Sequence, residues 1–109
     1  MQGLFLRRMF SEPAPAEVTI SVTGTGNSTH CYLTMPDGTK VTAAGSYKVT
    51  VGETIVCSIQ ASVFGESGVW LNGGKVVEAT GAYNYVVTKP ASIALEYSKS
   101  ASTIHITEE

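Results

Sequence analysis

Residues 45–61 carry the pattern that most constrains what this chain can fold into. Apolar side chains occupy every second position on both sides of a short turn, from Tyr47 before it and from Ile55 after it, and most positions between them are polar. Successive side chains on a β-strand point to opposite faces, so this alternation predicts two strands that each bury one face. The turn at Gly52 is expected to join them as a hairpin.

The same alternation recurs along the chain between turn residues, and no segment has a convincing helical period. Asp37-Gly38 and Asn72-Gly73 each stand between alternating segments, where such dipeptides are typical of tight hairpin turns because Gly accepts a positive φ. We therefore expect an all-β domain, specifically an immunoglobulin-like antiparallel β-sandwich of about eight short strands. The clearest alternating segments are residues 18–22, 31–35, 69–71, 83–87 and 93–97.

Length and charge narrow the class further. The 109 residues suffice for one domain with a single core, and 15% charged residues is low against the roughly 25% of globular domains. A net charge of −2 gives no electrostatic footprint for nucleic acid or for an anionic membrane surface, so neither is expected as a partner. No apolar run approaches the roughly 20 residues of a membrane helix, and the arginines of the first ten residues follow the apolar residues, unlike a secretory signal. The chain is expected to stay in the cytoplasm where it is made, unless it leaves within something larger.

Three parts are expected. Residues 1–16 comprise an apolar and basic head and a Pro/Ala linker, which is extended and stiff because it contains prolines. The head is interpreted either as a flexible terminus or as a short anchor that docks on a partner subunit. Residues 17–98 form the sandwich, and residues 99–109 form a C-terminal strand or an arm whose apolar face a neighbouring subunit would cover. The head residues predicted to contact a partner are Leu4, Phe5, Leu6 and Phe10.

Residues able to do chemistry are few and scattered. Cys31 and Cys57 both fall on the inward parity of their strands, and the missing secretory signal favours two buried thiols over a cross-sheet disulfide. His30 and His105 fall on outward parities and belong to no motif with an acid or a nucleophile. The glutamates stand singly, so no pair of carboxyls is placed for glycoside hydrolysis. We therefore predict no enzyme, no catalytic residue, no metal site and no cofactor.

Trp70 is the most informative aromatic residue, and two interpretations of it stay open. If its neighbours Val69 and Leu71 are buried, Trp70 lies on the outer face, where it could stack on a sugar or cover a subunit contact. Tyr83 and Tyr85 would be further residues of such a contact. Alternatively, Trp70 is itself the core aromatic of the sandwich, because Trp is highly buried on average.

Two resemblances add to these observations. An opening Val-Thr-Ile-Ser-Val-Thr, a central Gly-Ser-Tyr-Lys-Val-Thr-Val-Gly-Glu-Thr-Ile, a Val-Trp-Leu-Asn-Gly hairpin and a closing Ala-Ser-Ile-Ala-Leu-Glu-Tyr-Ser make residues 17–97 resemble bacterial immunoglobulin-like and surface-repeat modules. The head Leu-Phe-Leu-Arg-Arg-Met-Phe, the single β-domain and the end Thr-Ile-His-Ile-Thr-Glu make the whole chain similar to small structural proteins of phages and prophages of Gram-positive bacteria. Neither resemblance implies catalytic residues.

These resemblances imply a non-enzymatic structural or interaction module. The leading expectation is a tail or capsid-associated virion component, made in the bacterial cytoplasm and then carried in the virion. The alternative is a carbohydrate-binding or adhesive module at the bacterial cell surface. One copy of the module, with neither an export signal nor a wall-sorting tail, favours the virion. The expected partners are other virion or surface proteins, copies of the chain itself, or a glycan.

Overall fold

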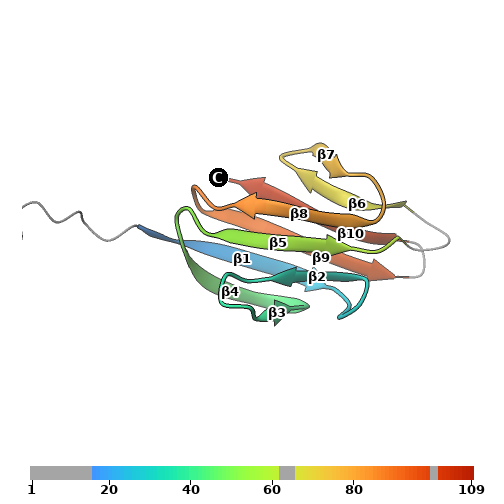
Figure 1. The fold of residues 1–109 in the computed structure, drawn as a ribbon, viewed down its shortest axis with the longest axis horizontal. Helices are drawn as coiled ribbons and strands as arrows, with labels where there is room; N and C mark the ends of the chain where they lie inside the picture. Colours follow the sequence, from blue (N-terminus) through green and yellow to red (C-terminus); the bar gives the residue numbers. More distant parts are fainter. Residues whose placement is uncertain (1–15, 62–65, 99–100) are drawn as a thin grey trace, which may run out of the picture.

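The computed structural model describes residues 16–61, 66–98 and 101–109, which form ten β-strands in two stacked sheets (Figure 1). The expectation of an all-β sandwich is therefore confirmed, with ten strands in place of about eight. No helix in the described part of the chain is long and apolar enough to cross a membrane. The predicted contact residues Leu4, Phe5, Leu6 and Phe10 lie outside the described residues.

The larger sheet has six strands in the order β4-β1-β9-β10-β6-β7, and the smaller has four in the order β3-β2-β5-β8 (Figure 1). The strands of the larger sheet are β1 (Glu17–Thr25), β4 (Ala43–Thr50), β6 (Glu66–Leu71), β7 (Gly74–Val77), β9 (Ala91–Ser98) and β10 (Ala101–Glu108). The strands of the smaller sheet are β2 (Cys31–Thr34), β3 (Lys40–Val41), β5 (Thr54–Ile59) and β8 (Gly81–Val86).

Two features of the pairing differ from the expectation. The sandwich is not wholly antiparallel, because β1 runs parallel to β9 and β6 runs parallel to β10. The predicted hairpin of residues 45–61 is also wrong: β4 pairs with β1 in the larger sheet, whereas β5 pairs with β2 and β8 in the smaller one. The turn at Gly52, with φ +100°, therefore carries the chain from one sheet to the other. Alternation specifies which face of a strand is buried but not which strand lies beside it.

The core lies between the sheets and is built from the inward residues of both. Ile104 and Ile106 on β10 are fully buried within the described domain, because this strand is central in the larger sheet and its inward face packs against β5 and β2 of the smaller sheet. The C-terminal segment is thus a central strand whose apolar face is covered by its own domain. Burying such a side chain completely is worth about 1.5–3 kcal/mol relative to exposing it.

Both cysteines face this core, as their parity predicts, and both are free thiols. Burial raises the pKa of the Cys31 thiol to about 11 and that of the Cys57 thiol to about 12, because a thiolate is poorly solvated among apolar side chains. The neutral thiols therefore act as small packing groups.

The predicted hairpin turn at Asn72-Gly73 is confirmed between β6 and β7. Both residues have positive φ, 50° and 88°, the backbone of the tight turn that matches the twist of two antiparallel strands. The turn is also held from the side, since Glu108 accepts hydrogen bonds from Asn72 Nδ2 at 3.0 Å and from the Tyr85 hydroxyl at 2.8 Å. One carboxylate thereby connects β6–β7, β8 and β10.

Candidate functional site

Three side chains from three strands meet on the solvent face of the six-stranded sheet, and we call them the Trp70 cluster. Trp70 of β6 and His105 of β10 stack with ring centroids 4.6 Å apart and planes 10° from parallel. Lys75 of β7 places its Nζ 5.0 Å from the centroid of the Trp70 ring. Aromatic stacking and a cation over an indole are each worth about 0.5–1.5 kcal/mol, so the cluster holds its own geometry.

Strand alternation explains why these side chains face solvent. Val69, next to Trp70, is fully buried, and so are the neighbours of His105 on both sides, Ile104 and Ile106. Since consecutive side chains on a strand point to opposite faces, Trp70 and His105 must point outward. The parallel register of β10 and β6 places these two residues directly opposite each other. The interpretation of Trp70 as the core aromatic is therefore not what the structure shows.

Lys75 reaches the indole through two local features of the β6–β7 hairpin. A register shift between Val69 and Trp70 pairs Trp70 with Lys75. Gly68 then leaves space for the lysine stem, because a Cβ placed there would lie 2.5 Å from Lys75 Cε and 2.6 Å from the Val77 carbonyl oxygen. Gly68 thus positions Lys75 over the ring.

The arrangement decides which part of Trp70 a partner can contact. Strands β10 and β7 flank β6 on opposite sides, so His105 and Lys75 take opposite faces of the indole. Trp70 is half-buried, so a partner can reach only the part of the indole that these two side chains leave uncovered. Next to His105 the solvent face of the sheet carries small side chains, since Ala94 pairs with His105 on β9 and Thr23 pairs with Ala94 on β1. Lys75, Trp70 and His105 therefore form a raised ridge beside a flat area made by Ala94 and Thr23.

The other predicted aromatic contacts lie elsewhere. Tyr85 is only 2% exposed and belongs to the core between the sheets, and Tyr83 packs against the same core from the same strand. Neither shares a face with Trp70, so a common stacking platform of Trp70, Tyr83 and Tyr85 does not form. Burial and its hydrogen bond to Glu108 raise the pKa of the Tyr85 hydroxyl, which keeps it a neutral donor.

Sequence reasoning missed the partners of Trp70 because they come from residues 35 and 5 positions away along the chain. The available signal was the outward parity of Trp70 and His105, but parity cannot place β10 beside β6. The same holds for His30, which stacks on Tyr97 with ring centroids 5.4 Å apart and planes 2° from parallel. Within residues 16–61, 66–98 and 101–109, no group of three or more His, Cys, Asp or Glu side chains is placed to hold a metal ion.

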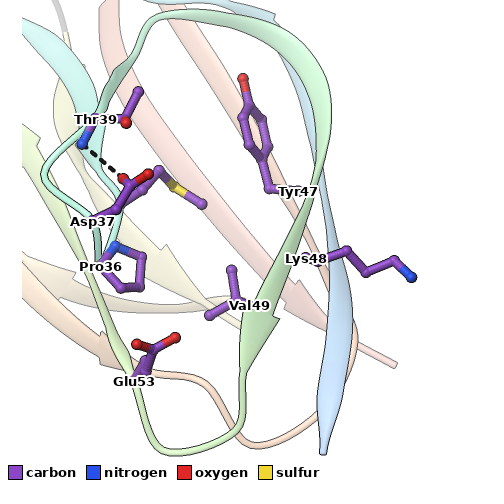
Figure 2. Close-up of a pocket in the computed structure, with 8 residues that line it drawn as sticks. Pro36, Asp37, Thr39, Tyr47, Lys48, Val49 and Glu53 are labelled. Carbon is purple, nitrogen blue, oxygen red and sulfur yellow. Dashed lines mark hydrogen bonds between the residues drawn. The ribbon is translucent and has the colours of Figure 1, made fainter.

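A pocket of about 290 Å³ forms a second candidate surface, at the far edge of the same sheet (Figure 2). Met35 and Val49, 6% and 2% exposed, form its apolar floor together with the half-buried Tyr47. Asp37 and Glu53 bring carboxylates to its rim.

Comparison of the chain with family models, with curated proteins and with solved structures gave no match.

Proposed function

We propose that this chain is a non-enzymatic interaction module that contacts a partner protein through the Trp70 cluster. The observation that carries the proposal is an ordered Trp–His–Lys stack on the solvent face of a sheet whose other face is the core. Trp is enriched among the residues that dominate binding energy at protein interfaces, and a cluster already held by its own contacts loses little side-chain entropy on binding. The ridge and the flat area of small residues beside it give this face a shape that a partner surface can match.

The setting that we propose is a virion of a phage or prophage, where the chain would be a tail or capsid-associated component. The support is the resemblance of its head, single β-domain and Thr/Ile-rich end to small phage structural proteins. The edge strands β4 and β7 add to it, since each has a strand neighbour on one side only within the described sheets. Exposed edges are templates for pairing with another chain. We further propose that the sandwich is immunoglobulin-like. The support is that the chain passes repeatedly from one of the two stacked sheets to the other.

Particle incorporation tests this proposal. Prophage induction in the parent bacterium, with the chain tagged, should release particles in which the tag co-sediments with capsid and tail proteins. Trp70→Ala should lower incorporation at least tenfold while the purified variant stays folded, and Val86→Ala, at an exposed position of the smaller sheet, is the control. A tag that never co-sediments with particles would refute the virion setting. Normal incorporation of Trp70→Ala would refute the role of the cluster.

A glycan is the second candidate partner, because Trp70 does lie on the outer face. The geometry demands a specific mode of binding: a sugar can stack on the indole only by displacing Lys75 or His105. Lys75→Ala should then strengthen glycan binding on an array, whereas Trp70→Ala should abolish it. Binding that survives Trp70→Ala would exclude Trp70 as the platform.

A further inference from the structure

The pocket at the β4 edge exists because the two sheets differ in length there. Strand β3 has two residues and pairs only with Leu33 and Thr34, whereas β4 has eight. The part of β4 from Tyr47 to Val49 therefore faces the β2–β3 turn across a gap that no strand among the described residues closes (Figure 2). The gap exposes the margin of the core and the free edge of β4 together.

The rim of this pocket carries negative charge over an apolar floor. Asp37 Oδ1 accepts a hydrogen bond from the Thr39 backbone N–H at 2.9 Å, and Glu53 Oε1 accepts one from the Thr50 N–H at 3.1 Å. The hydrogen bonds from Thr39 lower the pKa of Asp37, so this carboxyl is ionised at neutral pH. Lys48 also borders the pocket, but Figure 2 shows its side chain directed to the other side of β4, away from both carboxylates.

The chain itself contains a segment with the complementary chemistry. Residues 4–10 read Leu-Phe-Leu-Arg-Arg-Met-Phe, which places two adjacent cations between apolar side chains. We propose that residues 4–10 of one copy dock along the free edge of β4 in a second copy. Side chains alternate along an added strand, so Leu6, Arg8 and Phe10 share the face toward the pocket. Leu6 and Phe10 then cover Met35, Tyr47 and Val49, and Arg8 faces Asp37 and Glu53. An edge strand supplies backbone partners for an added strand, and the pocket supplies side-chain selectivity.

The start of the described chain argues for a second copy and against the chain's own pocket. The Ala16 carbonyl accepts a hydrogen bond from the Val51 N–H at 2.8 Å, so the chain enters the domain two residues from Glu53. Residues 11–15 contain Pro13 and Pro15, which favour an extended linker of about 3.1 Å per residue. An extended linker of five residues would span roughly 15 Å, so it favours a pocket on another copy over Glu53 of the same chain, which lies two residues from the Val51 that binds Ala16. The docking surface concerns β4 and does not depend on the Trp70 cluster.

Self-association of the full chain, measured by sedimentation velocity over a concentration series, tests the proposal. The head variant is Arg7→Glu with Arg8→Glu, which leaves every described residue unchanged. The pocket variant is Asp37→Asn with Glu53→Gln, which removes both charges but keeps oxygen acceptors for the Thr39 and Thr50 N–H groups. The wild-type chain should associate beyond its 11.5 kDa monomer, and each variant should associate at least tenfold more weakly.

Two controls match these changes in charge. Arg7→Lys with Arg8→Lys keeps the cations, and Glu66→Gln with Glu78→Gln neutralises two carboxylates away from the pocket; both should behave as wild type.

Mixing the two weakened variants separates docking between copies from docking within one copy. The pocket variant has an intact head and the head variant has an intact pocket, so an equimolar mixture should recover a two-chain complex. A mixture that stays monomeric would overturn the proposal, as would a wild-type chain that is monomeric throughout or a pocket variant that associates as strongly as wild type. A pocket variant that associates as strongly as wild type would not bear on the proposal that the Trp70 cluster binds a partner.

Discussion

Tyr85→Phe tests how the end of the sandwich is held together. Tyr85 is buried, but its hydroxyl reaches Glu108 Oε2 at 2.8 Å, and the same carboxylate accepts a hydrogen bond from Asn72 Nδ2 at 3.0 Å. The Asn72 side chain returns a contact, since its Oδ1 accepts a hydrogen bond from the Glu108 N–H at 2.8 Å. Removing one hydroxyl therefore removes a link between β8, the β6–β7 turn and β10.

The expected magnitude follows from the exposure of the two partners. A hydrogen bond to a charged acceptor contributes about 1.5–3 kcal/mol to the free energy of unfolding. Glu108 lies near the surface, where water replaces part of a lost contact, so we expect a loss of about 1–2 kcal/mol. For a domain of this size each kcal/mol lowers the melting temperature by about 4–8 °C. Tyr83→Phe, on the same strand with the same parity, is the matched control and should cost less.

The dependence on pH supplies a sharper check. Hydrogen bonds from Asn72 and from Tyr85, with the charge of Lys89, lower the pKa of Glu108 below its usual 4.5. A carboxyl with a lowered folded pKa contributes stability that is fully present above the unfolded pKa and is lost as the pH falls through the folded value. The difference in stability between wild type and Glu108→Gln should therefore be constant near pH 7 and disappear in acid. Denaturant unfolding at a series of pH values measures it, and a difference that persists unchanged in acid would refute the reasoning.

Two substitutions, followed by thermal unfolding, and one thiol-labelling experiment test the core and the backbone further. Gly24→Ala should lower the free energy of unfolding by more than about 2 kcal/mol, because Gly24 has φ +81° and a Cβ there would clash with the Leu95 carbonyl. Gly52→Ala is the control and should cost less, because Gly52 has φ +100° but open space around a new Cβ. Ile104→Ala should lower the free energy of unfolding by about 2–5 kcal/mol, and Val86→Ala, at a half-exposed position, should lower it little. Equal losses would contradict the assignment of Ile104 to the core. Cys31 and Cys57 should resist a thiol reagent at pH 8 in the folded protein and react after denaturation, since burial raises both pKa values; rapid labelling of the native protein would contradict this.

The sequence predicts the faces of the strands better than their neighbours. Alternation places Cys31, Ile55 and Cys57 inward, and all three are buried. The dipeptide at Asn72-Gly73 predicts its turn, because the positive φ of both residues is a local requirement. Long-range pairing leaves no such local mark. The parallel pairs β1–β9 and β6–β10 and the separation of β4 from β5 therefore could not be predicted.

The Trp70 cluster illustrates the same limit at the level of a site. Its three members are each exposed or half-exposed residues with ordinary local sequence, and only the register of β10 against β6 and the shift in β6–β7 bring them together. Gly68 would have been a useful hint, because a glycine within an alternating strand marks a close approach by another group. Which group approaches it depends on the hairpin register, which the sequence does not specify.

The positions of the two proposed surfaces imply that they act independently. In the order β4-β1-β9-β10-β6-β7, the pocket lies at β4 and the Trp70 cluster lies over β10, β6 and β7, at the opposite edge of the same sheet (Figure 1). Strands β1 and β9 lie between β4 and β10, so the two surfaces are about three strand spacings, roughly 14 Å, apart. Changes at sites this far apart, with no shared partner, add in free energy. A copy bound through its β4 edge can therefore still present Trp70 to a different partner, which is the property that a subunit within a larger assembly requires.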